Sequence, residues 1–342
     1  MEFHNYVGNK ATRLVSRIAA INAVPLSYLS MGERLNDQFA AGQTQLNGVS
    51  IPYAGWREQM RGCPASVAQA LRPFPQYCNE IYGQNENVGN STYHSLQLKF
   101  ERRLSEGFFF LGSYTFSKNL TSSDNAQTGS NPRLFSPYEQ GRNKSYADTD
   151  APHIFALSVT YDLPFGRGKR FASGSSRFTD YLIGGWQLTG ITRINSGIPI
   201  GFRSNFCTIP GPFATACIPG TIPGKNVLAQ ENGSYDPNLP RFNRDAFENY
   251  QLFGDGQYYG TGSRYTNIRT LPYQNQDLAL FKNIPILDDN KLNVQLRFEA
   301  FNVFNWHILT GWVTDISNPT FGAWNGGVSA PRNLQLGAKI TF

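Results

Sequence analysis

Stretches in which apolar and polar side chains alternate strictly recur along the whole chain. The clearest one closes it: in "PRNLQLGAKITF", residues 331–342, alternate side chains are apolar and the last is an aromatic ring. A period of two is the pattern of a β-strand whose two faces have different neighbours. Six further segments alternate in this way: two form a hairpin within 92–119, and the others lie near 152–163, 182–203, 274–283 and 291–306.

The first residues, "EFHNYV", indicate an eighth strand that is cut short. About seven residues are available there, against about 9–11 for a strand that crosses a bilayer. We therefore expect the chain to begin partway through a repeat, as a gene fragment or from a misassigned start.

The links between the expected strands alternate in length. Short links lie near 105–106, 164–180 and 284–290, and long links rich in Gly, Pro and Asn lie near 8–91, 120–151, 196–273 and 307–331. This alternation places every long link at one end of the sheet. Long structureless loops are uncommon in compact domains, whereas outer-membrane barrels combine short periplasmic turns with long extracellular loops.

Composition excludes a membrane protein built from helices. The mean hydropathy is −0.38, and no run approaches the roughly 18 apolar residues that a spanning helix requires. The chain nevertheless contains 25 Phe, 17 Tyr and 33 Gly among 342 residues, with only 16% charged residues. Many aromatic rings in a polar chain are compatible with a transmembrane barrel, whose strands are only about half apolar.

Charge separates the two faces of the expected strands. On the apolar faces we find only Arg102 and Lys282, each close to a short link where a charged group can reach water. The opposite faces carry charges of both signs, which suits a water-filled interior. The candidate interior residues are Lys99, Glu101, Arg193, Arg297 and Glu299.

These patterns predict an all-β fold, an antiparallel transmembrane β-barrel with long extracellular loops. We expect residues 1–342 to form one domain that supplies about eight strands of a larger barrel. A soluble β-sandwich is the alternative, since alternation alone fits both folds, but its polar faces would lie outside and its apolar faces would pack together.

Several segments, in order, resemble the last third of an Oar-like TonB-dependent outer-membrane transporter, a family common in Acidobacteria and their relatives. They are "YVGNKATRL", "STYHSLQLKFERRLSEGF", "SYTFSKNL", "YDLPFGRGKRF", "GGWQLTGITRINSGIPI", "QNQDLALFKNIPI", "LRFEAFNVFN" and "PRNLQLGAKITF". The resemblance implies a barrel of about 22 strands, an internal plug and a TonB box. We expect this chain to lack the plug domain and the carboxypeptidase-regulatory-like region.

The resemblance also implies a location and partners. We expect the outer membrane of a Gram-negative bacterium, contact with outer-membrane lipid, an unknown solute, and TonB as a partner only in a full-length form that carries a plug. The last strand resembles the signal through which outer-membrane proteins engage the barrel-assembly machinery. Its signal residues are Leu334, Leu336, Ala338, Ile340 and Phe342.

Four cysteines fall in two close pairs, Cys63 with Cys78 and Cys207 with Cys217. Neither spacing is a tight CxxC, so zinc binding and thioredoxin-type chemistry have little support. Four free thiols are expected in a reducing compartment. If the loops lie outside the cell, two local disulfides are the better interpretation.

The first long link also contains a helix signal. Ser30 and Glu33 have the spacing of a capping box. The segment "SYLSMGERLNDQF" is therefore expected to form a short amphipathic helix that packs Met31, Leu35 and Phe39.

Catalytic, cofactor and nucleic-acid motifs have little support. The four histidines are far apart, no GxSxG motif is present, and the Lys and Arg residues behind the net charge of +6 are scattered. We expect no enzyme activity, cofactor, metal or nucleic acid. A surface-exposed binding or adhesion module without energised transport is the main alternative function, and a secreted β-rich enzyme is a more distant one.

Overall fold

A computed structural model of the chain has one large antiparallel sheet as its main feature. The residues that it describes are 2–16, 21–78, 81, 86–105, 107–123, 140–204, 218–230, 235–248, 260–286 and 292–342. Among these residues, helices that are both long and apolar enough to cross a bilayer are absent.

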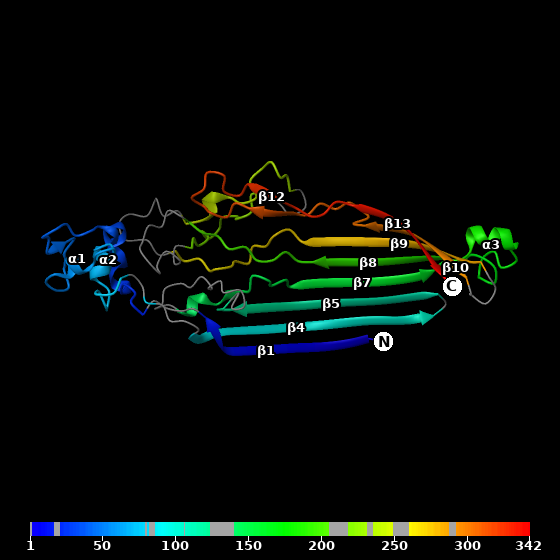
Figure 1. The fold of residues 1–342 in the computed structure, drawn as a ribbon, viewed down its shortest axis with the longest axis horizontal. Helices are drawn as coiled ribbons and strands as arrows, with labels where there is room; N and C mark the ends of the chain where they lie inside the picture. The colour runs from blue at the N-terminus through cyan, green and yellow to red at the C-terminus, as the bar shows by residue number, and fades with distance from the viewer. Residues whose placement is uncertain are drawn as a thin grey trace.

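Eight long strands lie side by side in the sheet, and each is antiparallel to its neighbours (Figure 1). In spatial order they are β1 (Glu2–Ser16), β4 (Glu86–Ser105), β5 (Phe108–Thr121), β7 (His153–Asp162), β8 (Trp186–Asn195), β9 (Tyr273–Pro285), β10 (Asn293–Phe301) and β13 (Asn333–Thr341). The short β6 (Ser145–Tyr146) pairs with the end of β5. Spatial order follows chain order, so the sheet is an up-and-down meander.

The strand register gives the sheet one apolar face and one polar face. Between β10 and β13, for example, Phe298 lies opposite Leu336, and the next residues, Glu299 and Gln335, face each other on the other side. Residues that face each other across an antiparallel pair share one face. Seven strands were expected from the alternation, and their apolar rows all meet on one face of the sheet. This confirms which side chains of each strand share the apolar face of the sheet, which we call the wall.

The apolar face is exposed in the chain as described. On β13 the exposed fractions are 69% for Leu334, 77% for Leu336 and 61% for Ile340. Exposed apolar surface on this scale indicates contact with something other than water. A lipid-facing wall accounts for it, and a soluble sandwich, which would cover this face, does not.

The first strand was predicted too short. β1 has 15 residues rather than about seven, and it pairs with β4 from Glu2 to Ser16 with a bulge around Arg13, whose φ is 57°. The first long link therefore begins after Ser16, not at residue 8. The alternation underestimated the length of this strand because its outward row carries Gly8 and Lys10. Backbone pairing with β4, and not side-chain polarity, sets its length.

Short and long connections lie at opposite ends of the sheet, as expected (Figure 1). The β7–β8 connection holds α3 (Arg177–Ile183), whose first turn is capped by the Ser176 hydroxyl accepting from the N–H of Thr179. The long connections carry small elements of their own: η1 (Leu26–Asn36), β2 (Gln45–Leu46), β3 (Val49–Ser50), α1 (Trp56–Gln59), α2 (Val67–Ala70), η3 (Gln140–Asn143), η5 (Arg244–Ala246), β11 (Leu309–Trp312) and β12 (Trp324–Val328).

The helix expected in the first long link is present in a different form. It is a 3-10 helix, η1, which begins after Pro25 without a side-chain cap and is interrupted at Gly32, where φ is 56°. The capping box was therefore wrong. Leu35 and Phe39 are nevertheless buried as predicted, with Met31 packed beside them.

Lys282 shows how a charge is accommodated on the apolar face. Its ammonium group donates to the carbonyl oxygens of Leu182, at 3.4 Å, and Gly184, in the turn after α3. It also lies 5.2 Å from the ring centroid of Trp186. The side chain thus reaches the end of the sheet, as the sequence suggested, instead of facing the lipid core.

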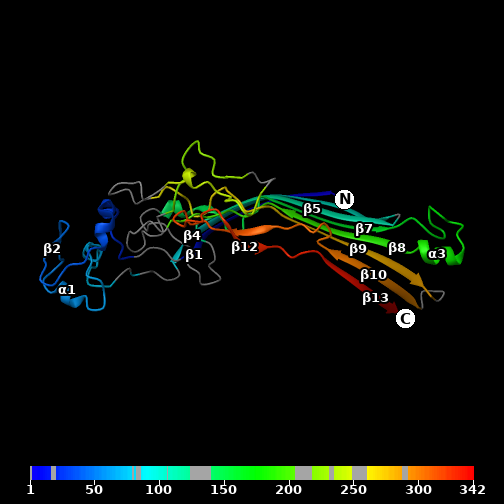
Figure 2. The same ribbon diagram turned by 90° about the horizontal axis from the view of Figure 1, so that it is seen from above.

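The sheet is open, with β1 and β13 at its two edges. From above, the strands turn progressively from β5 towards β13 (Figure 2). An all-β, antiparallel and partial barrel wall is therefore confirmed. The number of strands in a closed barrel stays a prediction.

Two neighbouring positions on β13 test the faces. Leu336→Arg places a charge among exposed apolar side chains near the middle of the strand, where it costs about 2–4 kcal/mol against lipid. Gln335→Arg is the matched control, because its side chain shares a face with Glu299. We expect the first variant to lower the amount of heat-modifiable protein in outer membranes and the second to leave it near the wild-type amount. Equal amounts of the two variants would contradict the assignment.

Candidate functional site

The five charged residues expected in the barrel interior all lie on the polar face of the sheet. Lys99 and Glu101 belong to β4, Arg193 to β8, and Arg297 and Glu299 to β10. Strands β5 and β7 separate β4 from β8, and β9 separates β8 from β10. These residues therefore form an extended polar wall and not one cluster.

Lys99 and Glu101 form an ion pair on β4, with 2.9 Å between Nζ and Oε2. Their side chains are 47% and 25% exposed, so the pair contributes little to stability. The pair presents a cation and an anion side by side, so it favours neither a cationic nor an anionic solute.

Two arginines of the wall lie against aromatic rings. The Arg193 guanidinium is 5.9 Å from the ring centroid of Tyr273, and that of Arg297 is 5.6 Å from the centroid of Phe281. Arg297 also donates from Nε to Oε1 of Gln295 at 2.8 Å. These contacts fix the direction of two long side chains and keep their charge on the polar face.

A shallow open depression of about 470 Å³ lies on the polar face across β1, β4 and β5. Most of its polar lining consists of neutral amides and hydroxyls, which both donate and accept hydrogen bonds. The lining residues are Asn5, Gln97, Leu98, Lys99, Leu111, Ser113 and Thr115. This lining can bind a hydroxyl- or amide-bearing solute without requiring it to be charged.

The depression was not predicted, because the alternation indicated only a short strand in place of β1. Asn5 lies directly opposite Gln97, and Asn9 opposite Tyr93. The spacing of Asn5 and Asn9, four residues apart, was the available signal, since residues i and i+4 of a strand share one face.

The first long link folds into a small unit of its own, which we call the first-loop module (residues 21–78 and 81). The N–H of Ile21 donates to the carbonyl of Ile81 at 2.7 Å, so the two ends of the module meet. The buried core consists of Val24, Leu35, Phe39, Trp56, Met60, Val67 and Ala68. Phe39 and Trp56 pack edge to face at its centre, with ring centroids 5.7 Å apart.

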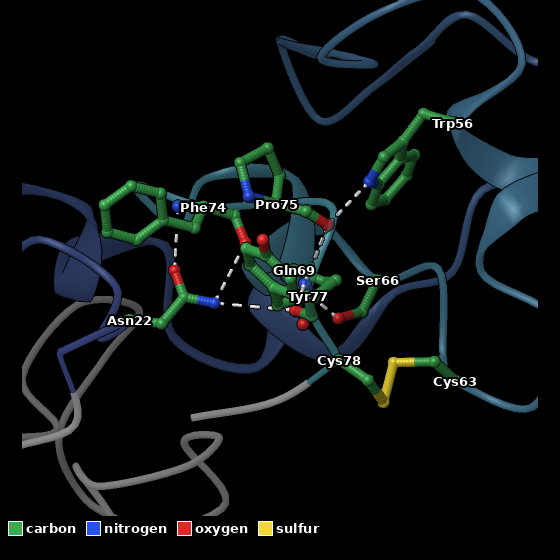
Figure 3. Close-up of a disulfide and its surroundings, with 9 residues drawn as sticks. All are labelled: Asn22, Trp56, Cys63, Ser66, Gln69, Phe74, Pro75, Tyr77 and Cys78. Carbon is green, nitrogen blue, oxygen red and sulfur yellow. Dashed lines mark hydrogen bonds between the residues drawn. A yellow bond between two sulfur atoms is a disulfide. The ribbon is translucent and has the colours of Figure 1, made fainter. Parts of the chain in front are cut away.

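Cys63 and Cys78 form a disulfide in this module, with their Cα atoms 5.8 Å apart (Figure 3). The sequence left free thiols and local disulfides as alternatives, and for this pair the structure has the disulfide. Cys207 and Cys217 lie outside the described residues.

The turn before Cys78 is held by side-chain donors from inside the module (Figure 3). Trp56 donates from Nε1 to the carbonyl of Pro75 at 2.9 Å. Gln69 donates from Nε2 to the carbonyls of Pro75 at 3.0 Å and Tyr77 at 2.6 Å. Gln69 is only 3% exposed, so these are buried hydrogen bonds that would be costly to lose.

Asn22, at the start of the module, also holds the turn before Cys78 through hydrogen bonds. Its amide donates to the carbonyl of Phe74 at 3.0 Å, and its Oδ1 accepts from the N–H of Phe74 at 2.8 Å. The Phe74 and Tyr77 side chains remain 44% and 54% exposed. The module thus presents two aromatic side chains on a fixed backbone, an arrangement suited to binding a ligand at low entropic cost.

A second buried cluster forms between the β8–β9 and β10–β13 connections. Its members are Ile200, Phe202, Phe242, Ala246, Phe247, Trp312, Ile316 and Phe321. Arg241 lies beside it, with its guanidinium 4.6 Å from the ring centroid of Trp312. Burial lowers the pKa of Arg241, and the nearby Tyr235 opposes this shift.

Arginines tie this cluster to the β5–β7 connection. Arg269 pairs with Asp150 at 2.6 Å, and the Asp150 side chain is only 1% exposed. Arg264 donates to the carbonyls of Thr121 at 2.7 Å and Asn143 at 2.9 Å. The β8–β9 and β5–β7 connections therefore share buried polar contacts, and the apolar cluster adds the β10–β13 connection at the same end of the sheet.

The residues of the expected assembly signal run along β13, from the end with the long connections to the opposite end of the sheet. Leu334, Leu336, Ala338 and Ile340 form the outward row of β13, opposite Ala300, Phe298, Leu296 and Val294 of β10. Phe342 follows the strand and is 99% exposed. Its ring is therefore accessible to a partner.

Among the described residues, groups of three or more His, Cys, Asp or Glu side chains that could hold a metal ion are absent. Two of the histidines on the outward face pair with tyrosines. His94 Nδ1 lies 2.6 Å from Tyr6 Oη, and His153 Nδ1 lies 2.7 Å from Tyr114 Oη.

The match to a protein family agrees with this architecture. Residues 4–335 match the family model described as outer membrane beta barrel domain. Among solved structures, the outer membrane transporter YddB from Escherichia coli is similar with a TM-score of 0.41 and 11% identity, over 98% of this chain and 30% of that one. No curated protein matches. Because the family model covers almost the whole chain, the protein belongs to the outer membrane beta barrel domain family and lies in the outer membrane.

Proposed function

We propose that this chain supplies wall and surface loops to a TonB-dependent outer-membrane transporter that imports a polar solute. The observation that carries the proposal is the continuous sheet with an exposed apolar face and a polar face of amides, hydroxyls and charges of both signs. An interior of this kind suits solute passage. The resemblance to Oar-like transporters in the order of the strand segments also supports it.

The polar face has the chemistry of a permissive path. Asn5, Gln97, Ser113 and Thr115 offer hydrogen bonds, and the Lys99–Glu101 pair adds both signs of charge. The proposal assigns binding and passage, not catalysis, to these side chains. It names an uncharged or zwitterionic solute as the class that this wall fits best.

In this proposal the long-loop end of the sheet faces the cell exterior. The short links then lie in the periplasm, as in other outer-membrane barrels. The first-loop module would meet the solute first, with Phe74 and Tyr77 as its contact side chains.

Two protein partners follow from the proposal. TonB would act on a plug in the full-length transporter, supplying energy that the wall itself does not. The barrel-assembly machinery would engage the end of β13, where Phe342 is exposed.

The second candidate is a surface binding or adhesion module without energised transport. The folding of the long connections around their own buried clusters favours it, because such surfaces can bind a partner without solute passage. This candidate needs the loops and does not need TonB.

Depletion of solutes from growth medium separates the two functions. A strain without this gene, a strain without TonB and a strain without both are grown beside the wild type, and their spent media are compared by mass spectrometry. For a transporter we expect the same solute to remain in all three mutant cultures, with no additive effect in the double mutant. If the strain without this gene depletes the same solutes as the wild type but binds less at its surface, adhesion is favoured.

The disulfide provides a separate test of the first-loop module. Replacing Cys63 and Cys78 with Ser opens a crosslink across 15 residues, which costs the module about 3 kcal/mol. We expect protease added to intact cells to cut within residues 21–78 of this variant sooner than in the wild type. The barrel should stay heat-modifiable, because its ladder does not involve the module.

Replacing Cys207 and Cys217 with Ser is the control for the loss of cysteines in general. Cutting within 21–78 should stay at the wild-type rate in this second variant. Equal cutting of the two variants, or no change in the first, would contradict a stabilising role for the Cys63–Cys78 disulfide.

A further inference from the structure

Three lysines gather on the outward face of the sheet, at the end that carries the long connections. The register sets two outward rows there. Gly8, His94 and Lys118 form one row across β1, β4 and β5, and Lys10, Thr92 and Leu120 form the next row towards the long connections. Lys10 and Lys118 are both exposed. Because they lie on the same face as Leu96 and Phe116, the expectation that this face carries only Arg102 and Lys282 was wrong.

Lys144 joins them from the segment just before β6. Its ammonium group donates to the Thr92 hydroxyl at 3.4 Å, and Thr92 lies opposite Lys10 in the register. The Lys118 ammonium lies 5.4 Å from the ring centroid of Tyr146. We call Lys10, Lys118 and Lys144 the outward lysine patch.

Aromatic residues mark the row adjacent to the patch on the membrane side. Tyr6, Phe116 and His153 lie in this row together with Leu96. The Phe116 and His153 rings are 5.1 Å apart between centroids. Aromatic rings concentrate at membrane–water interfaces, so the patch lies at the level of the lipid headgroups.

The described residues do not neutralise this positive charge. Asp150 is committed to Arg269, and Asp148 is half-buried after β6. Within the described part of the chain, none of the three lysines pairs with a carboxylate. Neighbouring like charges repel one another, so an anion placed between them would relieve a cost.

We propose that the outward lysine patch binds the phosphate groups of a phosphorylated glycolipid in the outer leaflet. The ligand is a lipid and not a soluble anion, because the patch continues directly into the exposed apolar face formed by side chains such as Leu96 and Phe116. Acyl chains would lie along these side chains while ammonium groups contact the phosphates. The choice of leaflet rests on the orientation in the proposed function, with the long connections outside.

The test uses the protein extracted from outer membranes and labelled diphosphoryl lipid A in neutral detergent micelles. Replacing Lys10, Lys118 and Lys144 together with Gln should raise the dissociation constant by about tenfold or more, given the contribution of each basic residue near an anionic surface. The control replaces Lys169, Lys225 and Lys339 with Gln, which removes the same charge elsewhere. Heat-modifiability of every variant checks that the barrel is folded.

Two further probes separate phosphate from acyl chains and lipid from free anion. Lipid A without phosphates should bind wild type and patch variant equally weakly, and millimolar inorganic phosphate should not displace the lipid. The proposal is overturned if the two triple variants bind diphosphoryl lipid A alike, if the dephosphorylated lipid binds as tightly, or if free phosphate competes. Binding to micelles involves no transport. The lipid-binding experiment therefore tests this proposal even if the uptake experiment shows no transport.

Discussion

The hydrogen-bond ladder between antiparallel neighbours is the constraint on which the rest of this structure depends. In hydrocarbon every backbone N–H and C=O group needs a partner within the protein, and the meander from β1 to β13 supplies one between each pair of consecutive strands. The ladder also fixes the faces, because a slip of one residue would exchange Glu299 with Phe298 on the lipid side. The outer edges of β1 and β13 are subject to the same requirement for a pairing strand.

Among the described residues, the buried apolar side chains lie in the connections and not in the wall. Both hydrophobic clusters belong to long connections, where water surrounds the chain. Along the strands, lipid takes the place of a protein core, and side chains such as Leu336 stay exposed in the isolated chain. The division explains why the composition is polar overall although the strands carry a full apolar face.

Strict alternation of apolar and polar residues made the strands of the wall predictable. Segments without this alternation were predicted incompletely or not at all. Leu334, Leu336 and Ile340 were placed correctly because period two has one structural meaning at this length. β1 was predicted too short since Gly8 and Lys10 interrupt its apolar row. The hydrogen bonds from Trp56 and Gln69 to the Pro75 carbonyl could not be foreseen, because they join segments with no local pattern in common. The same holds for the lysine patch, which depends on register across several strands.

The meeting of Ile21 and Ile81 at the base of the first-loop module changes the cost of pairing β1 with β4. The entropy lost on closing a loop grows with the logarithm of its flexible length. A folded insertion whose two ends meet costs as little closure entropy as a short linker, however many residues it contains. Once the module is folded, the first hairpin of the wall can close almost as readily as the tightly linked β4–β5 pair. The surface of the loop can therefore diversify in sequence and size with little penalty to the barrel beneath it.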